Sequence, residues 1–307
     1  MIAIIFALLL LPILFAPLET AQWASTRPLR PEPEKRKEFG PAPPLQLVYF
    51  TGVAGYSGDF LARREKALLD QIQELCPGIT VHHDVFPYSV SNLPLNGERV
   101  FRTLWMWLHK WRLKIPNNVF DVLIVIRNIG QLLVSADPRY GPSYNSGLAE
   151  VMEERLHPDA PTVFLAYSGG AQMAVGAARK LEGFLTHKPH LVALGGVFTD
   201  DPGIAAFETV VQLRGKRDYW VPELGRLIYP GLWRWQFWST WNRYRRSGKF
   251  RKVTSGLHCH VGKSDYFGFD KLPGNTEKSY GEQSAESVAK MVRKWSNPIC
   301  RPEVRAE

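Results

Sequence analysis

Short apolar runs alternate with helical patterns of apolar and polar residues from residue 45 onward. Most of the runs are apolar on both faces, which is typical of parallel strands covered by helices on each side of a sheet. The stretches between them, such as 147–155 and 171–185, have the helical spacing that crossover connections need. The pattern predicts an α/β fold with a mostly parallel sheet of about seven or eight strands and helices on both faces. The predicted strands are residues 45–52, 79–86, 119–126, 162–167, 191–198, 209–213 and 250–255.

The chain before residue 45 has a different character. Residues 1–18 carry no charged side chain, and residues 19–44 are Pro-rich and charged without an apolar period. We interpret the first segment as a membrane anchor or signal, the second as a linker, and residues 45–298 as a single α/β domain. Lys and Arg follow the apolar segment and none precedes it, so the positive-inside rule predicts an uncleaved N-terminal anchor with the domain in the cytoplasm. The alternative is export after signal cleavage near Ala16 or Ala21.

Composition narrows the class of protein further. Apolar residues make up 45% and charged residues 22% of the 307 residues, so the chain can bury a large core and is not disordered throughout. Three cysteines are too few, and too odd in number, for a disulfide framework. The formal net charge of +9 favours an anionic partner.

One junction between a strand and a helix has the composition of a catalytic turn. The apolar run 162–167 leads into Ser168, and a helix of small residues follows at once. A nucleophile on such a turn needs small neighbours two residues before and after it, and these are Ala166 and Gly170. The segment resembles the nucleophile elbow of the α/β-hydrolase superfamily, with Ala166 in place of the first Gly. The alternative is an ordinary strand-to-helix turn.

The resemblance implies where the partners of Ser168 lie along the chain. In the superfamily the acid follows the second strand after the nucleophile, and the histidine follows the last strand. Asp218 and His260 stand at those places, and His258 is the alternative base. The order of serine, acid and histidine is that of the superfamily. A fallback acid is one of the pair Asp200 and Asp201, which more readily cap the following turn.

The resemblance also implies an oxyanion hole made of main-chain amides. One donor would be the amide of Gly169, and the other that of Val53, in the loop after the first predicted strand. The family has His-Gly in this loop, whereas this chain has Thr51 and Gly52. The chemistry that follows needs no cofactor. A metal site at His258 and His260 is disfavoured, because the sequence offers no obvious third ligand nearby.

Two segments, residues 99–114 and 226–252, combine Lys and Arg with Trp and contain no acid. Trp beside cations is typical of a helix in a membrane interface. We expect a lipid surface as partner and disfavour nucleic acid, because the segments are apolar; packing of the Trp side chains in the core is the other alternative. The predicted interface residues are Trp105, Trp107, Trp111, Trp233, Trp235, Trp238, Trp241, Arg243, Arg245 and Arg246.

Together these patterns predict a membrane-associated serine hydrolase, of the esterase or lipase kind, that acts on an ester through an acyl-enzyme. The expected substrate is an ester-type or amphiphilic small molecule. The alternative is a non-catalytic protein of the same fold that binds a membrane or a partner, since Ala166 and Thr51 both depart from the family pattern.

Overall fold

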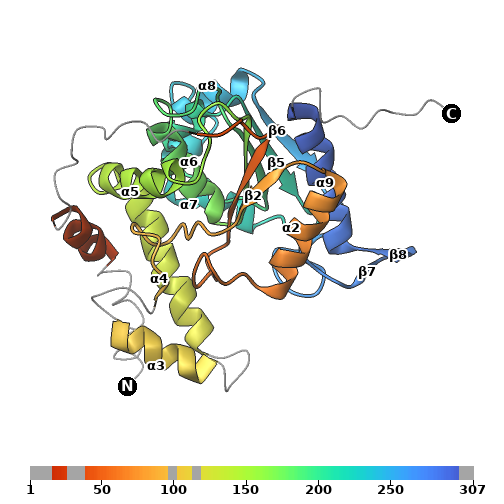
Figure 1. The fold of residues 1–307 in the computed structure, drawn as a ribbon, viewed down its shortest axis with the longest axis horizontal. Helices are drawn as coiled ribbons and strands as arrows, with labels where there is room; N and C mark the ends of the chain where they lie inside the picture. The colour runs from red at the N-terminus through yellow and green to blue at the C-terminus, as the bar shows by residue number, and fades with distance from the viewer. Residues whose placement is uncertain (1–15, 26–38, 96–101, 113–118, 297–307) are drawn as a thin grey trace.

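The computed structural model describes residues 16–25, 39–95, 102–112 and 119–296 (Figure 1). Its centre is a six-stranded parallel sheet with the order β2-β1-β3-β4-β5-β6. The strands are β1 (Gln46–Phe50), β2 (Thr80–His82), β3 (Thr162–Tyr167), β4 (His190–Leu194), β5 (Thr209–Arg214) and β6 (Phe250–Thr254). A separate antiparallel pair is formed by β7 (Lys271–Leu272) and β8 (Asn275–Ser279). The predicted α/β fold with a mostly parallel sheet is confirmed.

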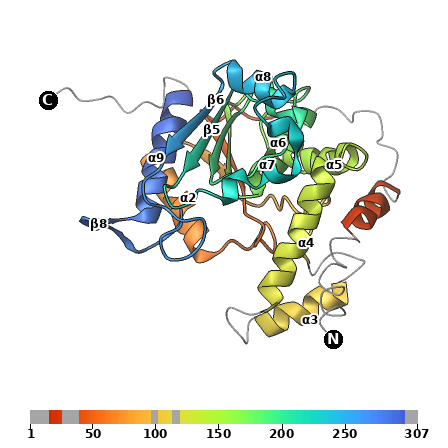
Figure 2. The same ribbon diagram turned by 180° about the vertical axis from the view of Figure 1, so that it is seen from behind.

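Helices connect the strands and cover the sheet (Figures 1 and 2). The α-helices are α2 (Arg63–Leu75), α3 (Arg102–Arg112), α4 (Val119–Ala136), α5 (Gly141–Glu153), α6 (Gly170–Lys180), α7 (Gly225–Ile228), α8 (Thr240–Arg246) and α9 (Tyr280–Trp295). A further helix spans residues 16–25. The 3₁₀ turns are η2 (Pro202–Ala206), η3 (Val221–Glu223) and η4 (Pro230–Leu232).

The two faces of the sheet bury alternate side chains of each strand, as a period of two requires. In β1, Leu47 and Tyr49 belong to the apolar cluster with residues of α2 and α9. Val48 and Phe50 belong to the opposite cluster, which includes residues of α4, α5 and α6. The central strands are therefore apolar on both sides, and this produces the continuous apolar runs of the sequence.

One predicted strand is wrong. Residues 119–126 form the first half of α4, so the main sheet has six strands where seven or eight were predicted. A run of eight residues that is apolar except for Asp121 fits a buried strand and a buried helix equally well, and only its continuation decides between them. The helical pattern continues through Asn128, Gln131 and Ser135, which are buried polar residues at helical spacing. The other predicted strands all contribute to the sheet, although 79–86 and 191–198 contribute shorter strands than predicted.

The predicted membrane location needs correction. Residues 1–15 of the predicted anchor lie outside the described residues. In the part of the chain that is described, no helix has the length and apolar character needed to cross a bilayer. The long apolar helix α4 is a core helix, with polar residues on its buried face.

The predicted linker begins within a helix. Glu19, in the helix 16–25, accepts hydrogen bonds from Arg127 Nη2 at 2.8 Å and from Gln131 Nε2 at 2.6 Å, both on α4. Ala16 and Thr20 are each 1% exposed. This helix is therefore packed against the folded domain through a buried ion pair.

His190 makes part of the stability depend on pH. Its ring stacks on Trp295 of α9 with centroids 4.2 Å apart, and burial lowers the pKa of His190 to about 4. An unfolded histidine has a pKa near 6.5, so between pH 6.5 and 4 the unfolded chain takes up a proton that the folded chain does not. We expect the free energy of unfolding to fall as the pH falls through this window, by about 1–2 kcal/mol from this group after allowance for its partial exposure.

Urea denaturation of wild type and His190→Phe at pH 7.5 and 4.5 measures this contribution. The variant keeps an aromatic ring against Trp295 but cannot titrate. It should lose less stability than wild type between the two pH values. Equal losses in the two proteins would contradict the prediction.

Candidate active site

The candidate residues meet at the carboxyl end of the sheet. From β1 the chain crosses to β2 on one side, and from β3 it crosses to β4 on the other side. The connections after β1 and β3 therefore diverge, which opens the kind of crevice where α/β proteins bind ligands. Ser168 follows β3, Asp218 follows β5 and His260 follows β6, so three parallel strands bring these residues to one edge.

Ser168 occupies a strained turn between β3 and α6. Its φ of 53° lies in the left-handed region, which a residue with a Cβ rarely adopts. Its amide donates to Leu194 O at 3.0 Å. A Cβ at Gly170 would lie 2.6 Å from Phe50 O and from Thr51 O. The turn therefore requires a residue without a side chain at position 170, as expected from the sequence.

The three predicted side chains form a continuous chain of hydrogen bonds. His260 Nε2 is 2.9 Å from Ser168 Oγ, and His260 Nδ1 is 3.0 Å from Asp218 Oδ2. The side chain of Asp218 is fully buried, and that of His260 is 11% exposed. The imidazole thus lies between a hydroxyl and a buried carboxylate, with one ring nitrogen toward each.

His258 lies apart from this chain of hydrogen bonds. Its Nδ1 is 3.3 Å from Ser255 Oγ, and its Nε2 is 3.1 Å from Tyr280 O and 3.2 Å from Ser284 Oγ. Burial lowers the pKa of His258, and the ring is completely buried. His258 and His260 therefore have different partners. No group of three or more potential metal-ligating side chains occurs within the described ranges.

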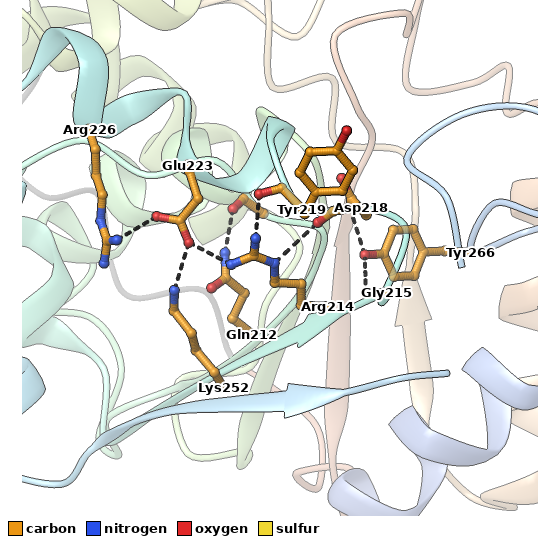
Figure 3. Close-up of polar contacts among 10 residues, drawn as sticks. Gln212, Arg214, Gly215, Asp218, Tyr219, Glu223, Arg226, Lys252 and Tyr266 are labelled. Carbon is orange, nitrogen blue, oxygen red and sulfur yellow. Dashed lines mark hydrogen bonds and ion pairs between the residues drawn. The ribbon is translucent and has the colours of Figure 1, made fainter. Parts of the chain in front are cut away.

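Tyr266 fixes the position of the carboxylate, a role that was not predicted from the sequence. Its hydroxyl donates to Asp218 Oδ2 at 2.7 Å and accepts from the Gly215 amide at 2.9 Å (Figure 3). Burial and the nearby Asp218 raise the pKa of Tyr266, so the hydroxyl stays protonated and can donate. Arg214 Nε donates to Asp218 O at 3.2 Å from the main-chain side.

The loop after β1 lies against Ser168. A Cβ at Gly169 would lie 2.7 Å from Val53 Cγ1, so the two predicted oxyanion donors belong to neighbouring residues. The Gly55 amide donates to Gly52 O at 2.9 Å and closes the loop into a turn. Thr51 Oγ1 donates to Glu65 Oε1 at 2.8 Å, which ties the start of the loop to α2.

Asn128 of α4 holds the same loop from the other side. Its Nδ2 donates to Val53 O at 2.9 Å and to Gly55 O at 2.8 Å, and the residue is completely buried. Tyr88 OH donates to Thr51 O at 3.2 Å. The role of Asn128 was not predicted from the sequence, because the residue lies two positions beyond the predicted strand 119–126.

The fallback acids have other contacts. Asp201 caps η2, because its Oδ1 accepts from the Gly203 amide at 2.8 Å, and its Oδ2 accepts from Gln172 Nε2 at 3.1 Å. Asp200 lies beside Gly231, where a Cβ would be 2.3 Å from Asp200 Oδ2. His260 contacts Asp218 and neither of these residues.

The predicted interface residues divide into buried and exposed groups. Trp105 is 1% exposed, and Trp241 packs on Phe198 and Phe250 with ring centroids 5.2 and 5.0 Å away. These two Trp residues are core residues, because helical spacing turns them inward, and their predicted place at an interface is wrong. The side chain of Trp111 lies outside the described residues. Trp107, Trp233, Trp235, Trp238, Arg243 and Arg246 are exposed, and Arg245 is half-buried.

The chain matches no protein-family model, and no curated protein sequence matches it. The arrangement of the side chains is therefore the basis for any assignment of function.

Proposed function

We propose that this protein is a serine hydrolase of the α/β-hydrolase type that cleaves an ester through an acyl-enzyme. One observation carries the proposal. Ser168, at a φ of 53°, is 2.9 Å from His260 Nε2 at the carboxyl edge of a parallel sheet, and His260 Nδ1 is 3.0 Å from Asp218 Oδ2. A hydroxyl, an imidazole and a carboxylate in this arrangement are an activated nucleophile with its base and the group that orients the base.

The reaction follows from these contacts. His260 Nε2 takes the proton of Ser168 as its Oγ attacks the ester carbonyl, and Asp218 stabilises the imidazolium that forms. The protonated His260 then donates the proton to the leaving alcohol. Water, activated by the same imidazole, attacks the acyl-enzyme and releases the acid and free Ser168.

The negative oxygen of the tetrahedral intermediate needs hydrogen-bond donors. The residues assigned to this role are Gly169 and Val53, which lie next to each other. Gly169 precedes the first residue of α6, and the partial positive charge at a helix N-terminus favours an anion there.

Labelling with a fluorophosphonate probe tests the proposal. The probe reacts covalently with an activated serine, so wild type should be labelled and Ser168→Ala should not. Ser287→Ala is the matched control and should be labelled like wild type, because Ser287 of α9 is half-buried and donates to Gln283 O at 2.8 Å. Hydrolysis of p-nitrophenyl esters should follow the same order.

Two results would overturn the proposal. One is equal labelling of wild type and Ser168→Ala. The other is a folded wild-type protein that neither reacts with the probe nor hydrolyses any ester in a series of acyl chain lengths, and this would favour a non-catalytic protein of the same fold.

Asn128 provides a prediction that separates positioning from folding. Asn128→Ala removes the donor to Val53 O and Gly55 O, so the loop beside Ser168 loses its support from α4. We expect kcat for ester hydrolysis to fall about 10- to 100-fold with little change in KM, because a small displacement of a catalytic group is costly. Steady-state kinetics on one ester measures both constants.

Gln131→Ala is the control for this variant. Gln131 lies one turn further along α4 and donates to Glu19, not to the loop. Both variants should lose stability, because each removes a buried hydrogen bond worth about 1–3 kcal/mol. A similar decrease of kcat in the two variants would show that Asn128 acts only through stability.

A further inference from the structure

The connection between β5 and α8 exposes many large apolar side chains. We call these residues the 219–238 surface, and their exposed fractions range from 38% to 78%. The ring centroids of Trp233 and Trp235 are 5.3 Å apart, and those of Phe237 and Trp238 are 4.8 Å apart. Soluble monomers rarely expose large apolar patches without a partner. The residues are Tyr219, Trp220, Leu227, Ile228, Trp233, Trp235, Phe237 and Trp238.

The backbone that carries these side chains is firmly held. Asn242 of α8 is 1% exposed, and its Nδ2 donates to Trp233 O at 2.8 Å and to Gln236 O at 3.0 Å. Val221 and Leu232 anchor the connection in the interior. The exposed side chains are therefore presented by an ordered segment, and their exposure is a property of the fold.

The charge beside this surface is positive. The segment 226–252 contains no acid. Glu223, just before it, is already in contact with Arg214 at 2.6 Å, Arg226 at 2.7 Å and Lys252 at 2.9 Å (Figure 3). The pKa of Arg245 is lowered by burial and by the nearby Arg234, Arg226 and Arg246. The cations thus repel one another, and an anionic partner would relieve this repulsion.

Three kinds of partner fit apolar and cationic groups together, and the details favour one. Stacking with nucleic acid uses aromatic rings, whereas Leu227 and Ile228, exposed by 78% and 62%, are aliphatic. A symmetric contact with a second copy would bring the cluster of Arg226, Arg234, Arg245 and Arg246 against the same cluster of the other copy. A bilayer with anionic headgroups accepts aliphatic side chains, aromatic rings and arginines at successive depths.

We propose that the 219–238 surface binds an anionic lipid surface, with Leu227, Ile228 and the exposed rings in the headgroup region and the arginines on the phosphates. This is a contact at the surface of a bilayer and does not involve the N-terminal segment. Tyr219 and Trp220 follow Asp218 directly in the chain. Binding would therefore bring the candidate active site close to amphiphilic esters, a consequence that rests on the proposed function.

Co-sedimentation with vesicles tests the proposal on the full-length chain. We expect binding to phosphatidylcholine vesicles that contain phosphatidylserine, weaker binding to phosphatidylcholine alone, and weaker binding at high salt. The double variant Leu227→Ser, Ile228→Ser should partition about tenfold less, because two exposed aliphatic side chains no longer enter the lipid. The double variant Arg234→Gln, Arg243→Gln should lose most of the preference for phosphatidylserine.

The controls are Val122→Ser on α4 and Lys290→Gln on α9, which are exposed residues outside the 219–238 surface. Both should bind like wild type. Ser168→Ala should also bind like wild type, so that the result is independent of the proposed chemistry. Absence of binding, or equal binding by all variants, would overturn the proposal. The proposal would also be overturned if wild type formed a dimer that dissociates in the Leu227→Ser, Ile228→Ser variant. Binding to nucleic acid or to an acidic polypeptide in place of vesicles would overturn it as well.

Discussion

Replacement of Asp218 by asparagine is expected to lower kcat for ester hydrolysis by about four orders of magnitude. The carboxylate oxygen Oδ2 accepts from His260 Nδ1 and from Tyr266 OH, at 3.0 and 2.7 Å. An asparagine can turn its NH₂ group toward the imidazole, and the ring nitrogen that faces Ser168 then carries the proton and cannot act as a base. The negative charge that stabilises the imidazolium is also lost. Pre-steady-state and steady-state kinetics on an activated ester measure the effect.

Asp201→Asn is the matched control for this prediction. Asp201 follows β4, the neighbouring strand of the sheet, and its carboxylate caps a 3₁₀ turn. The control should keep kcat within about a factor of three, since it does not contact His260. Tyr266→Phe should have an intermediate effect, because it removes one of the hydrogen bonds to Asp218 and leaves the charge. If Asp201→Asn were the inactive variant, the assignment of the acid to Asp218 would be wrong.

Gly170→Ala is expected to lower the free energy of unfolding by about 2–3 kcal/mol and kcat by about 100-fold. The new Cβ would lie 2.6 Å from the carbonyl oxygens of Phe50 and Thr51, and neither backbone oxygen can rotate away as a side chain could. The start of α6 and the loop after β1 must move apart. This displaces Ser168 from the loop that contains Val53. Thermal unfolding and ester kinetics on the same protein measure the two effects.

Gly183→Ala is the control for Gly170→Ala. A Cβ at Gly183 has no neighbour within 4 Å, and the residue is exposed. Its stability and kcat should stay close to those of wild type, within about 0.5 kcal/mol for unfolding. Equal effects of the two alanines would mean that the close approach at Gly170 has no functional consequence.

The strands near the candidate site could be predicted from the sequence for a physical reason. β3, β4 and β5 lie inside the sheet and are covered on both faces, so most residues of these strands are apolar, and the runs are visible without any knowledge of their neighbours. In a parallel sheet all the strands end at one edge. The resemblance to the α/β-hydrolase superfamily then implied Ser168 and Asp218 after two of these strands and His260 after the last strand, and the parallel sheet brings these three residues to one edge.

The segment 119–136 shows where this reasoning fails. An apolar run does not say whether a strand or a helix will bury it, and the answer depends on what packs beside it. In α4 the buried face includes Asn128 and Arg127, whose partners are the loop after β1 and the helix 16–25. The hydrogen bonds of Asn128 to the loop span 75 and 73 residues of the chain, and that of Arg127 to Glu19 spans 108. Side-chain hydrogen bonds at such separations leave no periodic pattern in a sequence.

By itself, the sequence determined the α/β class and the places of the central strands, because burial on both faces restricts the residue types locally. It also determined the order of Ser168, Asp218 and His260, and the tight turn at Ser168 restricts its neighbours to small residues. Only the tertiary structure decided between His258 and His260, turned Trp105 and Trp241 inward, and placed Tyr266 and Asn128 around the site. Such choices depend on distances between residues from different elements. Two histidines separated by one residue have nearly the same sequence environment, but the fold gives one of them Ser168 and Asp218 as partners and the other Ser255 and Tyr280.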